Sequence, residues 1–253
     1  MSNNYKISII LPNYNSDLFL NETIRSIKNQ THKNWELIIV DDNSNKKTKN
    51  ILLSLKKDKR IKIFYLKKNK GAGYCRNIAL KKAKAKYIAF IDSDDIWNKN
   101  KLTQQLNYMN KTGYDFTYTS YFTFRNFHKK RIINKINPIN KFDLSNFIND
   151  TSIGTSTIML KKNVIKNIRF TNTPILEDYF FKCQILRKVK FAHCFNKYLT
   201  FYRLRKDSLQ SNRLRNIYWL WHINHKYNKL SFIKNIFSII SISINSIKKY
   251  GFK

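Results

Sequence analysis

Three carboxylates lie within four positions of the segment YIAFIDSDDIW, residues 87–97. Asp92, Asp94 and Asp95 follow a run of mostly apolar residues that could fill a buried strand. Carboxylates so close together repel one another and are stable when a cation neutralises them. Hard oxygen ligands at this spacing suit Mg²⁺ or Mn²⁺, particularly an ion shared with a diphosphate. An ordinary acidic turn is the alternative interpretation, and we assign Asp95 to capping the helix that follows.

Polar segments also follow the first two apolar runs of the chain. PNYN (12–15) ends the first run and DDNS (41–44) ends the second. Pro12 and Tyr14 could flank a flat base, while a carboxylate of the second segment could accept the imide N–H of uracil or a ribose hydroxyl. Ligands of open parallel sheets bind beyond the carboxyl ends of the strands. We therefore expect these segments to converge with the acidic segment on one site, although each taken singly could be a turn.

The segment GAGYCRN (71–77) resembles a fragment of a dinucleotide-binding fingerprint. It lacks the third glycine and follows the third apolar run rather than the first, which argues against NAD binding. Arg76 and Asn77 open the next predicted helix. Arg76 is a candidate for a base or phosphate contact, with a solvated arginine at a helix start as the alternative.

The elements that must position these residues are short apolar runs separated by amphipathic segments. Asp17 could cap one amphipathic segment, and residues 48–57 form another. Repeated strand, helix and strand units predict a mostly parallel sheet with right-handed crossovers. The five predicted strands are KISIIL (6–11), ELIIVD (36–41), IKIFYL (61–66), YIAFID (87–92) and FTYTSY (116–121).

The pattern changes beyond Arg125. Residues 125–140 are basic and aperiodic, which predicts a loop or a mobile flap that could act as a lid. Residues 151–160 are predicted as a strand, and a helix that includes Asp178 follows. The segment FAHCFNKYLTFYRL (191–204) is predicted as a pair of strands.

The tail beyond Trp219 has the pattern of an amphipathic helix. Six apolar residues recur at helical spacing, while serines and asparagines occupy the other faces and lysines lie at the ends. Docking on the core and peripheral attachment to an anionic bilayer are the two interpretations. The apolar stripe consists of Ile233, Ile236, Phe237, Ile240, Ile244 and Ile247.

Length and composition set wider limits. The chain has 253 residues, enough for one large α/β domain with an appended region. It carries 49 Lys and Arg against 15 Asp and Glu, a formal net charge of +34. This charge predicts attraction to nucleic acid, an anionic membrane or phosphorylated substrates, although an AT-rich genome would also enrich lysine.

The three cysteines lack the spacing of metal ligands, so the sequence predicts neither disulfides nor a zinc site, which fits a reducing cytoplasm. No signal peptide or spanning helix is predicted.

Taken in order, four of these segments resemble the family 2 glycosyltransferases, which are inverting enzymes that use nucleotide sugars. The segments are ISIILPNYN, QTHKNWELIIVDDNS, GAGYCRNIAL and AKYIAFIDSDDIW, within residues 6–110. Later, ILEDYFF (175–181) resembles the family's Glu-Asp segment and YRLRKDSLQSN (202–212) its Tyr-Arg segment. The resemblance implies an α/β fold of the GT-A type, with a Rossmann-like, mostly parallel mixed sheet flanked by helices.

The resemblance also implies a division of the chain. Residues 1–124 would form the nucleotide-sugar-binding half. Residues 125–215 would form the acceptor-binding and catalytic-base half of the same domain. Residues 216–253 would be a C-terminal amphipathic helical tail.

A role for each matching residue follows from the resemblance. Asp178 would be the catalytic base, and Asp94 would bind the Mn²⁺ or Mg²⁺ that bridges the diphosphate. Asp42 would read uracil if the donor is a UDP-sugar. Arg205 stands where the family often has His, so the role of that His does not transfer, and Arg205 could pair directly with the diphosphate. The nucleotide would be held by Pro12, Tyr14, Asn15, Asp42, Arg76 and Asp92.

The expected reaction is inverting transfer of a sugar from a nucleotide diphosphate, above all UDP, to a hydroxyl. The acceptor would be a glycan or a lipid-linked sugar in the synthesis of lipopolysaccharide, O-antigen or capsule. The expected location is cytoplasmic, with peripheral attachment to the inner face of the membrane.

Two other functions compete with this expectation. One is transfer of the sugar to a polyprenyl phosphate, where a catalytic base is less necessary because the acceptor is already an anion. The other is a non-enzymatic basic protein that binds RNA or membrane, against which the converging carboxylates argue. Nucleic acid is not an expected partner.

Overall fold

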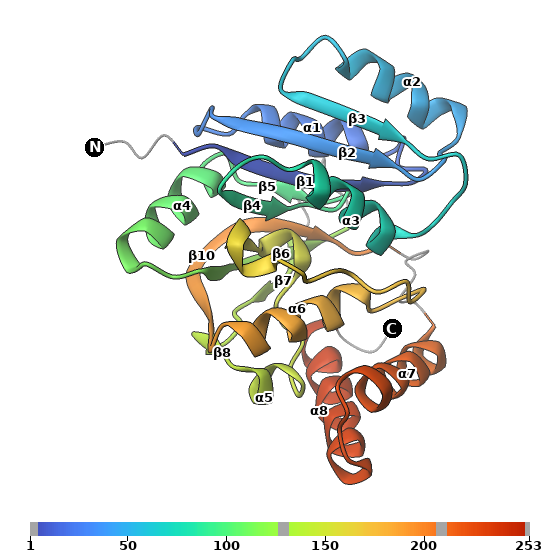
Figure 1. Ribbon diagram of the computed structural model, residues 1–253, viewed down its shortest axis with the longest axis vertical. Helices are drawn as coiled ribbons and strands as arrows, with labels where there is room; N and C mark the ends of the chain where they lie inside the picture. Colours follow the sequence, from blue (N-terminus) through green and yellow to red (C-terminus); the bar gives the residue numbers. More distant parts are fainter. Residues whose placement is uncertain (1–4, 126–131, 206–211, 251–253) are drawn as a thin grey trace.

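A computed structural model describes residues 5–125, 132–205 and 212–250 and contains a ten-stranded mixed sheet (Figure 1). The strands are β1 (Ile7–Asn13), β2 (Trp35–Asp41), β3 (Ile61–Tyr65), β4 (Tyr87–Phe90), β5 (Ile96–Trp97), β6 (Phe116–Phe124), β7 (Ile132–Ile136), β8 (Lys141–Phe142), β9 (Met159–Lys161) and β10 (Ala192–Arg203). The order across the sheet is β3-β2-β1-β4-β9-β6-β10-β5, with β7 paired to β6 and β8 to β10.

Helices of very different length accompany the sheet. They are α1 (Leu20–Lys28), α2 (Lys46–Leu55), α3 (Ala72–Lys82), α4 (Lys101–Thr112), α5 (Leu144–Phe147), α6 (Glu177–Lys188), α7 (Arg213–His222) and α8 (Phe232–Tyr250). Three single turns complete the described part of the chain: η1 (Thr155–Thr157), η2 (Lys162–Ile165) and the π-turn η3 (Ile223–Tyr227).

The first four strands are parallel, as the sequence predicts. β1 pairs with β2 and β4, and β2 pairs with β3, all in parallel register. Antiparallel β9 joins β4 to β6, which makes the sheet mixed. The carboxyl ends of β1 to β4 therefore share one edge of the sheet.

Helices cover both faces of this parallel part. Alternate strand residues point to opposite faces. Ile9 packs in one apolar cluster with residues of α1, α2 and α4, whereas Ile10 packs in a second cluster with residues of α3 and α6. Two buried cores thus hold the strand ends in fixed positions relative to one another.

Two caps differ from the sequence prediction. Asp17 does not cap α1, which begins after Phe19 without a side-chain cap. Instead the Oδ1 of Asp17 accepts hydrogen bonds from Asn45 and Thr48, on the neighbouring α2. Asn45 caps α2, because its side chain accepts a bond from the Thr48 N–H. Asp95 caps no helix either, since the short strand β5 follows it.

Three predicted segments of the second half also differ. Residues 132–136 form β7 against β6 rather than a loop, while residues 126–131 of the predicted flap lie outside the described residues. In 151–160 only the last two residues belong to a strand, because η1 precedes β9. Residues 192–203 form one long strand rather than a pair. Register shifts around Tyr198 bend β10, so one strand has the sequence pattern of two.

None of the helices in the described ranges is long and apolar enough to cross a membrane.

A buried lysine in α4 gives a prediction about stability. Lys101 is 0% exposed, its Nζ donates to Gln105 Oε1 at 2.7 Å, and burial lowers its pKa to about 7. Between about pH 7 and pH 10 the unfolded chain binds the extra proton, so this group makes wild-type stability rise with pH. We expect Lys101→Met to stabilise the protein by about 2 to 4 kcal/mol near pH 6 and by progressively less toward pH 10.

Thermal unfolding of both proteins across this range measures the difference. Lys99→Met is the matched control, because Lys99 is exposed and its replacement should change stability little at any pH. A stabilisation by Lys101→Met that is constant with pH would contradict the assignment.

Candidate active site

The polar segments at the ends of β1 and β2 meet directly. Asn13 Nδ2 donates to Asp41 Oδ1 at 2.7 Å, and the Asp42 N–H donates to the Asn13 carbonyl oxygen at 2.8 Å. Asn15 has a positive φ of 45° and joins the same network, because its Oδ1 accepts from the Asn45 N–H at 2.8 Å. The parallel register of the two strands thus brings together segments nearly 30 residues apart, as the sequence predicts.

Pro12 and Tyr14 lie differently within this edge. Pro12 is buried as part of β1, whereas the Tyr14 side chain just beyond the strand is 50% exposed. An exposed ring at a strand end can stack on a flat base. Tyr14 is therefore available for the predicted contact, and Pro12 could act only through the shape of the strand end.

Asp42 is buried and fixes the loop before α3. Its two carboxylate oxygens accept the N–H groups of Lys70 and Gly71, both at 2.7 Å. Gly71 has a φ of 86°, a conformation that favours glycine. Each carboxylate oxygen has a second lone pair, so Asp42 can hold this loop and still accept a bond from a ligand.

Arg76 bridges two carboxylates from distant parts of the chain. Its Nη2 lies 2.7 Å from Asp92 Oδ1 and its Nη1 lies 2.6 Å from Glu177 Oε1. Burial alone would lower the pKa of Arg76, but Asp92 and Glu177 raise it above its ordinary value. The side chain is only 5% exposed, so it is not a solvated arginine. Glu177 was not predicted as the partner of Arg76, although it lies in the Glu-Asp segment ILEDYFF.

The start of α3 packs closely on this bridge. A Cβ atom at Gly73 would lie 2.7 Å from the Thr171 carbonyl oxygen and 2.8 Å from Glu177 Cγ. The glycine therefore permits the approach that places Arg76 between its two carboxylates.

The three clustered aspartates have different environments. Asp94 Oδ2 lies 3.3 Å from Arg205 Nη1, and burial together with Asp92 raises the pKa of Asp94. Asp95 is buried, accepts the Arg203 N–H at 2.9 Å, and has a pKa well above its ordinary value because of burial. Asp95 therefore anchors the end of β10 instead of capping a helix.

Arg203 is a structural residue that the sequence analysis did not single out. Its Nε donates to the Asp94 carbonyl oxygen at 2.8 Å and its Nη2 to Glu22 Oε2 at 2.6 Å. These bonds tie β10 and α1 to the acidic segment. They hold the backbone of that segment in place while the side chains of Asp92 and Asp94 stay partly exposed.

Asp178 lies in the first turn of α6, beside Glu177. Its Oδ2 accepts hydrogen bonds from Thr155 Oγ1 and Lys182 Nζ, both at 2.7 Å. Burial would raise the pKa of Asp178, but Lys182, Arg76 and Thr155 lower it well below its usual range. The carboxylate is therefore ionised at neutral pH and can accept a bond from a substrate hydroxyl. Neither Thr155 nor Lys182 was predicted. Only the tertiary fold brings Thr155 to α6, whereas the i,i+4 spacing of Asp178 and Lys182 on a predicted helix was a signal for that pair.

The acidic segment fits a particular kind of metal site. Within the described ranges, no three His, Cys, Asp or Glu side chains are arranged to hold a metal ion. Asp92 and Asp94 could supply two carboxylate ligands, which suits an ion whose other ligands are water and phosphate oxygens. Burial and, after it, the charge of Asp92 raise the pKa of Asp94, and a bound cation would offset both effects.

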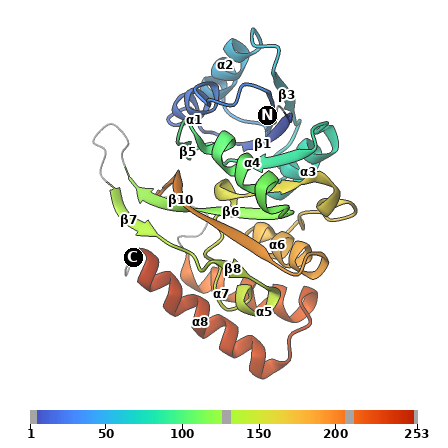
Figure 2. The same ribbon diagram turned by 90° about the vertical axis from the view of Figure 1, so that its left-hand side faces the viewer.

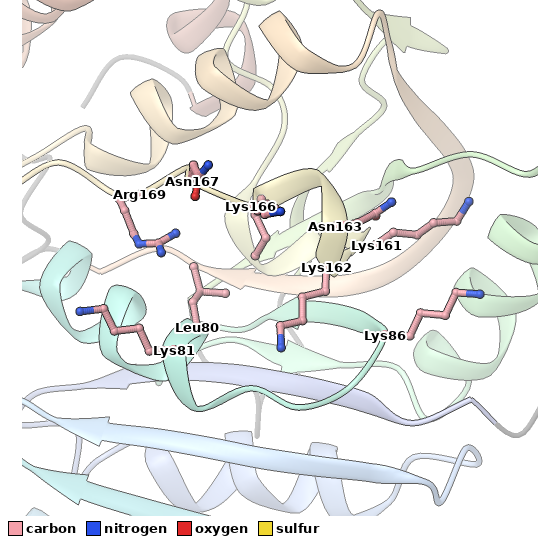
Figure 3. A pocket seen from close by; sticks show the side chains of 10 residues that line it. Leu80, Lys81, Lys86, Lys161, Lys162, Asn163, Lys166, Asn167 and Arg169 are labelled. Carbon is pink, nitrogen blue, oxygen red and sulfur yellow. The ribbon is translucent and has the colours of Figure 1, made fainter.

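A basic pocket of about 640 Å³ lies elsewhere (Figure 3). Lys86 precedes β4, and Lys161 is paired with Tyr87 at the start of that strand. The pocket is therefore at the amino end of β4, away from Asp92. Its lining residues are Leu80, Lys81, Lys86, Lys161, Lys162, Asn163, Ile165, Lys166, Asn167 and Arg169. It would attract anions, but it contains none of the predicted site residues.

Comparisons with known proteins agree with this geometry. Residues 8–169 match the profile "Glycosyl transferase family 2". TuaG of Bacillus subtilis, named as a teichuronic acid biosynthesis glycosyltransferase, is 32% identical over 251 residues that cover 96% of both chains. WfgD of Escherichia coli, a UDP-Glc:alpha-D-GlcNAc-diphosphoundecaprenol beta-1,3-glucosyltransferase, is 32% identical over 98% of this chain and 96% of its own.

A solved structure shows the same fold. S. aureus TarS 1–349 in complex with UDP-GlcNAc superimposes with a TM-score of 0.73 at 20% identity, over 96% of this chain and 73% of that one. The relatives are enzymes, so the non-enzymatic interpretation is not retained. The chain belongs to glycosyl transferase family 2 and is a glycosyltransferase with the GT-A fold.

Proposed function

We propose that the protein transfers a sugar from a UDP-sugar to a hydroxyl of a lipid-linked acceptor during the synthesis of a cell-surface polysaccharide. The observation that carries the proposal is the Arg76 bridge. Arg76 binds Asp92 at the predicted donor site and Glu177 at the start of α6, where Asp178 lies next in sequence. The two ion pairs of this one buried side chain link the predicted donor site to the start of the helix that carries the proposed base. The name of WfgD supports a lipid-linked acceptor, and the name of TuaG supports a role in polysaccharide synthesis.

In the proposed reaction Asp178 acts as general base. It accepts the proton of the acceptor hydroxyl while that oxygen forms a bond to the anomeric carbon. The bond from this carbon to the diphosphate breaks, and UDP leaves with the bonding electrons. Attack from the face opposite UDP inverts the anomeric centre. Lys182 and Thr155 orient the base for this step, because both bind its Oδ2.

The nucleotide would lie along the edge formed by β1 and β2. Tyr14 would stack on the base, Asp42 would accept the uracil N–H, and Asn15 would position the loop between them. Glycosyltransferases of this fold commonly use divalent metals. Mn²⁺ or Mg²⁺ bound by Asp94 would stabilise the charge that develops on the leaving diphosphate.

A binding assay with a panel of nucleotide sugars tests the donor. A ligand that binds only the folded state at about 100 times its Kd stabilises it by about 2.7 kcal/mol, which thermal unfolding detects. We expect stabilisation by UDP and a UDP-sugar in the presence of Mn²⁺, and less by GDP-mannose. The Asp42→Asn variant should lose the preference for UDP. If no nucleotide sugar stabilised the wild type, the proposal would be rejected.

Lys182 provides a prediction about pH. Replacing it with Met removes the principal cation that lowers the pKa of Asp178, so burial then raises that pKa. The acid limb of kcat against pH should move upward by about 1 to 3 pH units. Lys182→Arg keeps the charge and should leave the limb near its wild-type position. An unchanged limb in Lys182→Met would mean that another group controls it.

Arg205 provides a prediction about the metal. Its guanidinium is a cation beside Asp94 and lies 5.1 Å from the centre of the Phe19 ring. In Arg205→Ala we expect UDP affinity to fall about tenfold, through the loss of a charged hydrogen bond to the diphosphate. Mn²⁺ affinity should rise, because Asp94 loses a competing cation. Calorimetric titration with UDP and Mn²⁺ measures both, with Arg205→Lys as control. If UDP affinity and activity were unchanged, Arg205 would have no role at the diphosphate.

A further inference from the structure

Helix α8 packs on the protein with a side that contains buried polar residues beside the partly buried Ile239 and Ile242, and it exposes most of its apolar residues. Asn235 and Ser238 are fully buried, whereas Ile233 and Phe237 are 79% and 62% exposed. An ordinary surface helix has the opposite arrangement. We call the exposed apolar residues of α8 the α8 stripe. They are Phe232, Ile233, Ile236, Phe237, Ile240 and Ile244.

The polar contacts fix the orientation of α8. Ser238 Oγ donates to the Ile148 carbonyl oxygen, and Asn245 Nδ2 donates to the Asn149 carbonyl oxygen at 3.2 Å. At the N-terminal end, Asn235 Nδ2 donates to the Trp221 carbonyl oxygen of α7 at 3.2 Å. A rotation that buried the α8 stripe would break these bonds. The exposed stripe is therefore a consequence of specific packing.

The segment that forms α7 and α8 is basic and contains no acidic residue. Residues 212–250 include seven Lys or Arg and no Asp or Glu. Lys226, Lys229, Lys234 and Lys248 are exposed. Helix α7 contacts α8 at the lower end of the molecule (Figures 1 and 2). It also exposes Leu214. This combination of apolar residues and flanking lysines is typical of helices that lie in a membrane interface.

We propose that the α8 stripe docks the protein on an anionic lipid bilayer. Charge complementarity favours this occupant over a second copy of the chain, because two such surfaces would repel each other while anionic headgroups attract them. The helix would lie in the plane of the interface. The α8 stripe runs from Phe232 to Ile244, a rise of about 18 Å along the helix, and could contact the headgroup region over that length.

A short series of contacts links α8 to the proposed base. Lys249 at the end of α8 binds Asp150 Oδ1 at 2.9 Å and Ser152 Oγ at 2.7 Å. The next residue, Ile153, accepts a bond from Lys182, which in turn holds Asp178. The base is thus a few contacts from α8. The link between membrane docking and catalysis rests on the proposed function, because a lipid-linked acceptor would lie at the membrane surface.

Flotation with vesicles tests the docking without reference to activity. The full chain should float with phosphatidylcholine vesicles that contain phosphatidylglycerol and float poorly with phosphatidylcholine alone. The triple substitution Ile233→Ser, Phe237→Ser and Ile240→Ser should reduce partitioning at least about tenfold. The matched control carries Leu18→Ser, Leu53→Ser and Ile139→Ser, three exposed apolar residues outside α8, and should float as the wild type does.

A second pair of variants tests the charge. Lys226→Gln, Lys229→Gln and Lys234→Gln together should weaken binding to anionic vesicles. Equal charge removal at the basic pocket, by Lys81→Gln, Lys86→Gln and Lys166→Gln, should not. Equal flotation of the α8 variant and wild type would overturn the proposal, as would a wild type that forms a dimer through α8 and ignores vesicles.

Transfer assays separate this inference from the proposed function. The α8 variant should use a water-soluble acceptor analogue at the wild-type rate and lose activity toward the same sugar diphosphate on a long lipid in vesicles. If neither acceptor is used by the wild type, the proposed function fails while the flotation result still decides the docking.

Discussion

Replacement of Asp178 by Asn is expected to lower kcat for glycosyl transfer by about 10³-fold, with UDP affinity within about twofold of wild type. An amide keeps the shape of the carboxylate, and its oxygen can still accept the bonds from Thr155 and Lys182. It cannot take the proton of the acceptor hydroxyl. The effect should therefore fall on the chemical step, which single-turnover kinetics with saturating donor and acceptor would isolate.

The control for this experiment is Asp115→Asn. Asp115 is also paired with a lysine, Lys161, at 2.6 Å, but β9 places that pair at the amino end of β4. Its loss should leave kcat unchanged. The rival reaction gives the opposite result for Asp178: transfer to a polyprenyl phosphate, whose acceptor is already an anion, would continue at nearly the wild-type rate in Asp178→Asn.

The parallel part of the fold was predictable because its signal is local. Strands buried on both faces are continuous apolar runs, and the polar residues that end them must meet at one sheet edge. The hydrogen bond of 2.7 Å from Asn13 Nδ2 to Asp41 Oδ1 confirms that the ends of β1 and β2 meet. The prediction that β4 continues to Asp92 was too long by two residues, because β4 ends at Phe90.

The partners of the charged residues could not be read from the sequence. Arg76 and Glu177 are about 100 positions apart, and only the packing of α6 against α3 brings them together. Periodicity likewise identified five of the six residues of the α8 stripe, with Ile247 in place of Phe232, but not the side that packs on the protein. Local pattern specifies that a helix has two faces, whereas polar contacts such as that of Ser238 with Ile148 decide which face is buried.

The second large effect is expected at Arg76, where replacement by Gln should lower both stability and activity. Loss of the guanidinium leaves Asp92 and Glu177 as uncompensated carboxylates, and breaking a buried ion pair in this way costs about 3 to 5 kcal/mol. Transfer activity should fall at least about 10²-fold, because Asp92 and the start of α6 lose their common anchor. Denaturant unfolding and steady-state kinetics measure the two effects.

A matched control and a double substitution test whether Arg76 acts through its ion pair with Glu177. Arg60→Gln removes an arginine from an ion pair with Asp58, but this pair is 39% exposed on the arginine side and should contribute less than about 1 kcal/mol. Adding Glu177→Gln to Arg76→Gln should recover part of the lost stability, because one unpaired carboxylate is neutralised. It should not recover activity, since Asp92 remains without its partner. Independent, additive effects of the two substitutions would show that Arg76 and Glu177 do not act as a pair.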